Sequence, residues 1–130
     1  MIKILLALLF YSTIIHANHI HWLGDYDKAH VLAQKEHKAL MVLLVKKPCN
    51  LCNQTIQKLF MNQPYIDPLN KKFIPVILTY GGAENYPIEM YYSSTFPTLF
   101  FVNSNDESFL TTPLYGKQIQ AKTIQKMLDE

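Results

Sequence analysis

The chain has 130 residues, 49% of them hydrophobic, and a formal net charge of +2 at pH 7. This length is enough for one domain with one hydrophobic core, and we expect no second domain. Its 12 positively charged side chains are all lysines, spread along the sequence without the basic block that nucleic-acid binding requires. A nucleic acid is therefore not an expected partner.

Residues 1–17 have the pattern of an export signal. Lys3 provides a short positive start, an apolar run covers 4–15, and Ile15-His16-Ala17 offers a cleavage site. An uncleaved membrane anchor is the alternative, but this run is well short of the ~20 residues that a spanning helix needs. We therefore expect a signal peptide over 1–17, a mature domain over 18–130, and a periplasmic or secreted location in a bacterium.

The first elements of the expected domain are a helix, a strand and a second helix. Asp25 can cap a helix that ends near residues 36–38. Its apolar positions recur at helical spacing and are Tyr26, Ala29, Leu32 and Ala33. The continuous apolar run 40–45 is typical of a strand covered on both faces. Pro48 ends that strand, and a helix follows from Asn50 and closes before Pro64.

The middle of the chain predicts a short helix and a second strand. The helix lies around 65–70, and the strand over 73–79 ends at Gly81-Gly82. Pro75 is tolerable in this strand only near its start or on an unpaired side, because proline has no N–H to donate.

The last elements follow an irregular stretch that is rich in tyrosine. A third strand covers 98–102, and the polar turn 103–106 makes 108–111 its expected antiparallel hairpin partner. Gly116 precedes a final helix with a buried stripe that consists of Ile119, Ile124, Met127 and Leu128. This order of elements predicts an α/β domain with a mixed central sheet flanked by helices.

The chain has only two cysteines, in the sequence Cys49-Asn50-Leu51-Cys52 at the start of the second helix. Two thiols at this spacing can close into a disulfide and reopen. The helix N-terminus, together with Lys46 and Lys47 nearby, favours a thiolate at Cys49. Helix geometry also predicts that Cys49 is the exposed, attacking thiol and that Cys52 is turned inward.

Two other interpretations of the cysteine pair are weaker. A purely structural disulfide over so short a loop would remove little chain entropy and stabilise the fold poorly. Half of a zinc site would require a second pair of ligands, and the chain has no other cysteines.

Several motifs together resemble the thioredoxin superfamily, in particular its secreted or periplasmic thioredoxin-like branch. They are the cysteine pair after a buried strand, Phe96-Pro97-Thr98 before a strand, Tyr115-Gly116 before the last helix, and an opening with Trp22, Asp25, Tyr26, Ala29 and Lys38. The resemblance covers residues 22–129. It implies a thioredoxin-like fold in a single domain.

The resemblance also implies roles for individual residues. Cys49 would attack substrates, Cys52 would resolve the mixed disulfide, and Pro97, in the cis form, would face the pair. Phe96 and Pro97 would line the substrate groove together with Pro48, Asn50 and Leu51. Two positions depart from thioredoxin itself, which has a tryptophan where this chain has Pro48 and a buried aspartate where it has Leu43.

The aromatic residues before Pro97 allow two interpretations. They are Tyr86, Tyr91, Tyr92 and Phe96. They form either a platform for extended substrate segments or, more simply, part of the core.

The expected function is that of an exported thiol:disulfide oxidoreductase with a redox-active centre at Cys49 and Cys52. It would act as a monomer on protein thiols and disulfides, and a membrane or protein partner would reset the pair. No cofactor is expected, because the two cysteines carry the two electrons. Oxidation of exported proteins, reduction of wrongly bridged ones and reduction of apocytochrome c all remain open.

A copper-binding protein or metallochaperone of the same fold is the rival function. His19 and His21 could supply imidazole ligands beside the two thiols. The copper carriers that share this fold have three residues between their cysteines and a histidine far downstream, whereas no histidine follows His37 here. We therefore expect no metal site.

Overall fold

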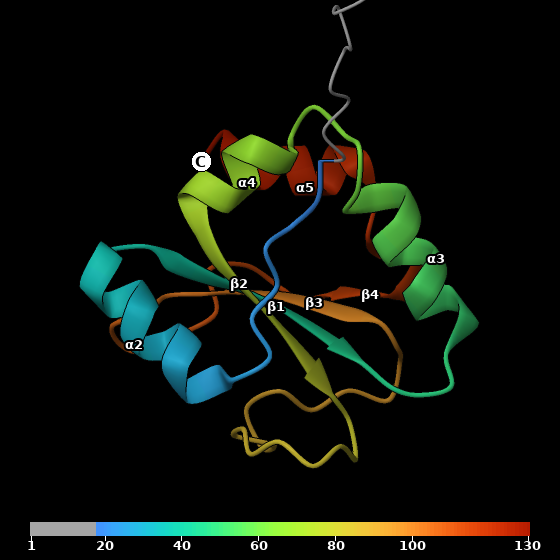
Figure 1. Ribbon diagram of the computed structural model, residues 1–130, viewed down its shortest axis with the longest axis horizontal. Helices are drawn as coiled ribbons and strands as arrows, with labels where there is room; N and C mark the ends of the chain where they lie inside the picture. The colour runs from blue at the N-terminus through green and yellow to red at the C-terminus, as the bar shows by residue number, and fades with distance from the viewer. Residues whose placement is uncertain (1–17) are drawn as a thin grey trace, which may run out of the picture.

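The computed structural model describes residues 18–130, and the expected signal peptide lies outside this range (Figure 1). In chain order the elements are α2 (Tyr26–Glu36), β1 (Ala39–Val45), α3 (Asn50–Leu59), α4 (Ile66–Lys72), β2 (Phe73–Thr79), β3 (Thr98–Val102), β4 (Leu114–Tyr115), the 3₁₀ helix η2 (Gly116–Gln118) and α5 (Ala121–Leu128). None of the helices in this range is long and apolar enough to cross a membrane.

The four strands form one mixed sheet in the order β2-β1-β3-β4. β1 is parallel to β2 and antiparallel to β3, and β3 is antiparallel to β4. Figure 1 shows α2 on one side of the sheet and α4 with α5 on the other. The expected α/β domain, a mixed central sheet flanked by helices, is confirmed.

Both faces of β1 are buried, which explains why its sequence is apolar without alternation. On one face, Leu40, Val42 and Leu44 pack in the core cluster that includes α2. On the other, Met41, Leu43 and Val45 pack in the cluster that includes α3, α4 and α5. The strand that leads to the cysteines is therefore fixed from both sides.

The ends of most elements match the prediction. The Asp25 side chain caps α2 by accepting a hydrogen bond from the backbone N–H of Lys28. Of the four apolar positions in α2, Tyr26, Ala29 and Ala33 are buried, whereas Leu32 is 36% exposed.

Pro75 lies in the edge strand β2, and its carbonyl accepts from the N–H of Leu23 on the side away from β1. Since the nitrogen and oxygen of a strand residue point to the same side, Pro75 withholds no donor from the sheet.

The expected hairpin partner over 108–111 pairs antiparallel with the end of β3, but it does not form a strand. Its pairing is limited to an isolated bridge between Val102 and Phe109, and the strand that pairs with β3 on the side away from β1 is β4. Leu99 and Val102 of β3 are three residues apart in sequence. Their pairing partners, Leu114 and Phe109, are five residues apart. The two extra residues interrupt the ladder just before β4, where Pro113 has no N–H to donate.

Candidate active site

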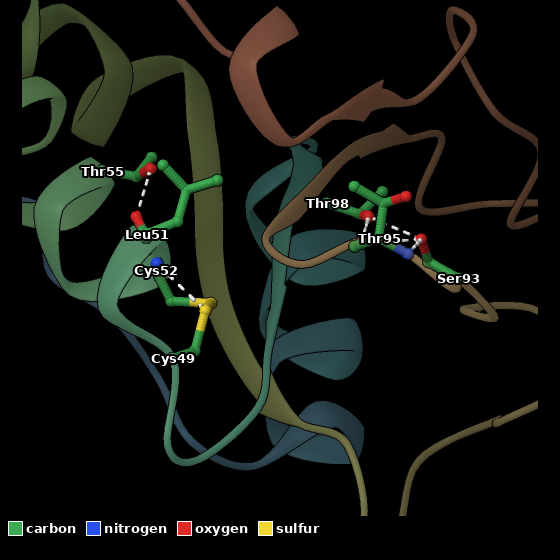
Figure 2. Close-up of a disulfide and its surroundings, with 7 residues drawn as sticks. All are labelled: Cys49, Leu51, Cys52, Thr55, Ser93, Thr95 and Thr98. Atoms are coloured by element: carbon green, nitrogen blue, oxygen red, sulfur yellow. Dashed lines mark hydrogen bonds between the residues drawn. A yellow bond between two sulfur atoms is a disulfide. The ribbon is translucent and has the colours of Figure 1, made fainter.

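The cysteine pair lies at the N-terminus of α3, directly after the loop that leaves β1. Cys49 is the N-cap residue of α3 with an extended backbone, and it forms a disulfide with Cys52 (Figure 2). The backbone N–H of Cys52 donates to Sγ of Cys49 at 3.1 Å. The sulfur thus takes the place of the side-chain oxygen that usually caps a helix.

The two sulfurs differ in exposure. Cys49 is partly exposed, whereas Cys52 is 2% exposed and belongs to the core cluster that contains Leu43. Among residues 18–130 the buried polar side chains are all hydroxyls, so no carboxylate lies buried near Cys52. A thiol from another molecule has access to Cys49 and not to Cys52.

The residues next to Cys49 in the loop and in the first turn of α3 are positively charged or neutral. Lys46 and Lys47 are exposed in the loop before it, and the ammonium of Lys46 lies 5.2 Å from the ring centre of Phe96. The first turn of α3 has no acidic residue. The partial positive charge at the helix N-terminus and the N–H of Cys52 would both stabilise a thiolate at Cys49.

The loop before β3 holds Pro97. The Phe96–Pro97 and Lys47–Pro48 peptide bonds are both cis. Pro97 is buried, and its carbonyl accepts a hydrogen bond from the N–H of Gly116 at 2.8 Å. This bond ties the loop to the end of β4.

Three hydroxyl residues that sequence reasoning missed brace this loop (Figure 2). Ser93 donates to the carbonyl of Thr95 at 2.8 Å, and its oxygen accepts from the Thr95 N–H at 3.0 Å. The buried hydroxyl of Thr98 lies 2.8 Å from Ser93 Oγ. The clustering of hydroxyls in Ser93-Ser94-Thr95 and Thr98 around Phe-Pro was the available signal, because such side chains bond to nearby backbone.

Gly116 joins the loop to the cysteine helix. Its φ is +53°, and a Cβ at this position would lie 3.2 Å from Cγ2 of Thr95 and 4.0 Å from Cδ2 of Leu51. The first turn of α3, the loop before Pro97 and the start of η2 therefore meet at one place.

The remaining expected substrate contacts differ in exposure. Pro48 and Asn50 are exposed, while Leu51 and Phe96 are partly buried. The ring of Phe96 packs 5.4 Å from that of Tyr80. The other aromatics form no single platform with it, because Tyr91 is fully buried and Tyr92 is 66% exposed.

His19 and His21 lie near the other end of α3. His19 forms a bridge with Met61, which follows the C-terminus of α3, and Cys49 lies about 15 Å away at the N-terminus, one helix length of ten residues. In residues 18–130 no three side chains of histidine, cysteine, aspartate or glutamate gather where they could hold a metal ion. The structure does not bring the histidines to the cysteines.

Comparisons with known proteins give structural likeness only, since the chain matches no family model and no curated protein. A thioredoxin from Thermus thermophilus is 19% identical with a TM-score of 0.66, over 85% of each chain. A putative disulphide-isomerase from Bacteroides thetaiotaomicron is 22% identical with a TM-score of 0.70, over 86% of this chain and 93% of that one. DsbH oxidoreductase is 15% identical with a TM-score of 0.68, over 89% and 87%. As its sequence motifs indicated, the chain has the thioredoxin fold.

Proposed function

We propose that this protein is an exported thiol:disulfide oxidoreductase that exchanges disulfides with protein thiols through Cys49 and Cys52. The observation that carries the proposal is the asymmetry of the pair: a partly exposed sulfur at a helix N-terminus is linked to a buried one. Structural neighbours that are named thioredoxin, disulphide-isomerase and oxidoreductase support the same chemistry.

In the reducing direction, the thiolate of Cys49 attacks one sulfur of a substrate disulfide. A bond forms between Cys49 and that sulfur, the substrate S–S bond breaks, and the other substrate sulfur leaves as a thiolate that takes up a proton. Cys52, after losing its proton, then attacks Sγ of Cys49 and releases the second substrate thiol. Two electrons pass to the substrate, and the protein is left with its disulfide closed. The oxidising direction is the reverse.

The residues around the pair stabilise the thiolate, contact the substrate or position the loop of Pro97. The N–H of Cys52 stabilises the thiolate of Cys49, as does the N-terminus of α3. Phe96 and Pro97 face the substrate chain from one side, and Pro48, Asn50 and Leu51 contact it from the other. Gly116 and Ser93 hold the loop of Pro97 in position.

The location and the redox partner belong to the same proposal. Residues 1–17 direct export to the periplasm, and a membrane or protein partner returns the cysteine pair to its working state. Cell fractionation with an antibody to the native protein tests the location.

Trapping of mixed disulfides tests the chemistry. In cells that express Cys52→Ser, the attack by Cys49 still occurs but the mixed disulfide persists, so substrate proteins should be captured. Cys49→Ser is the matched control and should capture none. Equal capture by the two variants, or capture by neither, would contradict the roles assigned to the cysteines.

A further inference from the structure

The surface beside the cysteines carries lysines that no acidic residue opposes. The chain has 10 acidic residues, and none of them lies in segments 37–66 or 108–128. These two segments include α3, η2 and α5, and Ile119 after η2 and Ile124 in α5 pack in the same core cluster as Cys52. Within these elements the lysines therefore have no acidic neighbour along the chain.

A shallow groove runs between α3 and η2 in this region. It has a volume of about 220 Å³, and it is lined by Leu51, Gln54, Thr55, Lys58, Leu59, Gly116, Lys117 and Ile119. Lys58 and Lys117 face it from opposite elements, and both are exposed. Among residues 18–130 neither lysine takes part in an ion pair.

Leu51 and Gly116 place the groove next to the candidate active site. Leu51 lies between the two cysteines in sequence, and a Cβ at Gly116 would lie 3.2 Å from Thr95 of the loop that carries Pro97. From Leu51 to Lys58 the helix rises about 10 Å, which an extended chain covers in about three residues. A polypeptide bound at Cys49 would therefore place side chains about three residues from its own cysteine beside Lys58.

We propose that this groove selects substrate proteins with acidic residues about three positions from the reacting cysteine. This inference rests on the proposed function and names its substrate class. Lys58 and Lys117 supply the charge complementarity, and the apolar side chains of Leu51, Leu59 and Ile119 accept the hydrophobic part of the segment. Desolvated by the bound chain, the two ammonium groups attract its carboxylates more strongly than in open water.

Synthetic peptides provide a direct test. Each peptide has one cysteine joined to 2-thiopyridine through a disulfide, with glutamate, glutamine or lysine at the second to fourth positions on both sides. The thiolate of Cys49 in reduced protein attacks the peptide sulfur, and the thiopyridine leaves as its coloured thione. Cys52 then attacks Cys49 and frees the peptide thiol, so the reaction needs no other reductant.

We expect the glutamate peptide to react about tenfold faster than the glutamine peptide at low ionic strength, and the lysine peptide to be slowest. The preference should largely disappear at about 1 M salt, where charges are screened within a few ångströms. The double variant Lys58→Gln/Lys117→Gln should lose most of the preference. Lys28→Gln/Lys35→Gln removes the same charge from exposed positions on α2, beyond the other face of the sheet, and should keep it.

The outcomes separate this inference from the proposed function. Equal rates for the three peptides, or the same loss of preference in both double variants, would overturn the acidic-substrate groove while leaving disulfide exchange intact. If no peptide reacts, the proposed function itself fails. Vesicles with anionic lipids test whether the groove binds a membrane surface instead. Suppose that the protein binds these vesicles only when Lys58 and Lys117 are present and shows no preference among the peptides. This result would assign the groove to a membrane surface and overturn the inference.

Discussion

The backbone N–H of Cys52 points at the sulfur of Cys49 from 3.1 Å. The three-residue separation of the cysteines and the helical start of α3 together create this contact, because an N-cap side chain accepts from an amide of the first turn. In the reduced protein the same amide would face the Cys49 thiolate. The sequence spacing thus sets both which sulfur is exposed and which one receives a hydrogen bond.

Selective alkylation of the reduced protein should show this difference. We expect limiting iodoacetamide to modify Cys49 at least ~10 times faster than Cys52, because Cys49 is partly exposed at a helix N-terminus and Cys52 is buried. Mass spectrometry of proteolytic fragments measures the ratio. In strong denaturant the two thiols should react alike, and equal labelling in the native protein would contradict the assignment.

Gly116 should be sensitive to the addition of a single methyl group. Its φ of +53° is costly for other residues, and a Cβ would press against Thr95. We expect Gly116→Ala to reduce the free energy of unfolding by roughly 1–3 kcal/mol. Urea unfolding followed by circular dichroism measures this.

Gly24→Ala is the matched control for Gly116→Ala. A Cβ at Gly24 would meet no atom within 4 Å, and its φ lies outside the left-handed range. Its effect on stability should be much smaller. Equal losses in the two variants would mean that the contact with Thr95 is unimportant.

The sequence predicted those parts of the fold that depend on local pattern and burial. Val42 and Leu43 point to opposite faces of β1, and the uninterrupted apolar run reflected cores on both sides. The end of the sheet was harder to predict, because the pairing of Leu114 with Leu99 depends on how the chain returns after its turn. From the sequence alone, the polar turn and the apolar residues Phe109 and Leu110 after it are equally compatible with a hairpin strand over 108–111.

The candidate site shows the same limit. Spacing alone identified Cys49 and Cys52, because their chemistry needs only one helix turn. The hydrogen bonds of Ser93 depend on a loop conformation that no periodicity records. The approach of Gly116 to Thr95 joins segments that are distant in sequence, so it required the folded chain.

Ser93 should stabilise the loop that carries Pro97. Ser93→Ala removes the acceptor of the Thr95 N–H and a partner of the buried Thr98 hydroxyl. The Thr98 hydroxyl keeps its second partner, the Thr95 carbonyl, so the loss comes mainly from the unpaired Thr95 N–H and should be about 1–3 kcal/mol of the free energy of unfolding. Ser94→Ala, at the exposed neighbouring position, should change stability little in the same urea experiment. If Ser94→Ala lowers the free energy of unfolding as much as Ser93→Ala does, the hydrogen bonds of Ser93 are not the cause of the loss.

Alkaline pH should destabilise the protein through Tyr26 and Tyr91. Their hydroxyls are 2.7 Å apart, and both side chains are buried. Burial raises the pKa of Tyr26 from 10.0 to about 12, and it also raises the pKa of Tyr91. Between pH 10 and pH 12 the unfolded chain loses the Tyr26 proton, whereas the folded protein keeps it. The contribution of Tyr26 to the free energy of unfolding is therefore fully present below pH 10 and is lost as the pH rises towards 12.

For Tyr26 alone, a shift from 10.0 to about 12 corresponds to a loss on the order of 2–3 kcal/mol over that interval. Urea unfolding at several pH values from 9 to 12 should show this decline. The double variant Tyr26→Phe/Tyr91→Phe keeps both rings and removes both phenols, so its stability should fall less steeply. Tyr92→Phe is the control, because that side chain is 66% exposed in the folded protein, and it should retain the wild-type decline. An equal decline in the double variant would show that other groups cause the alkaline loss of stability.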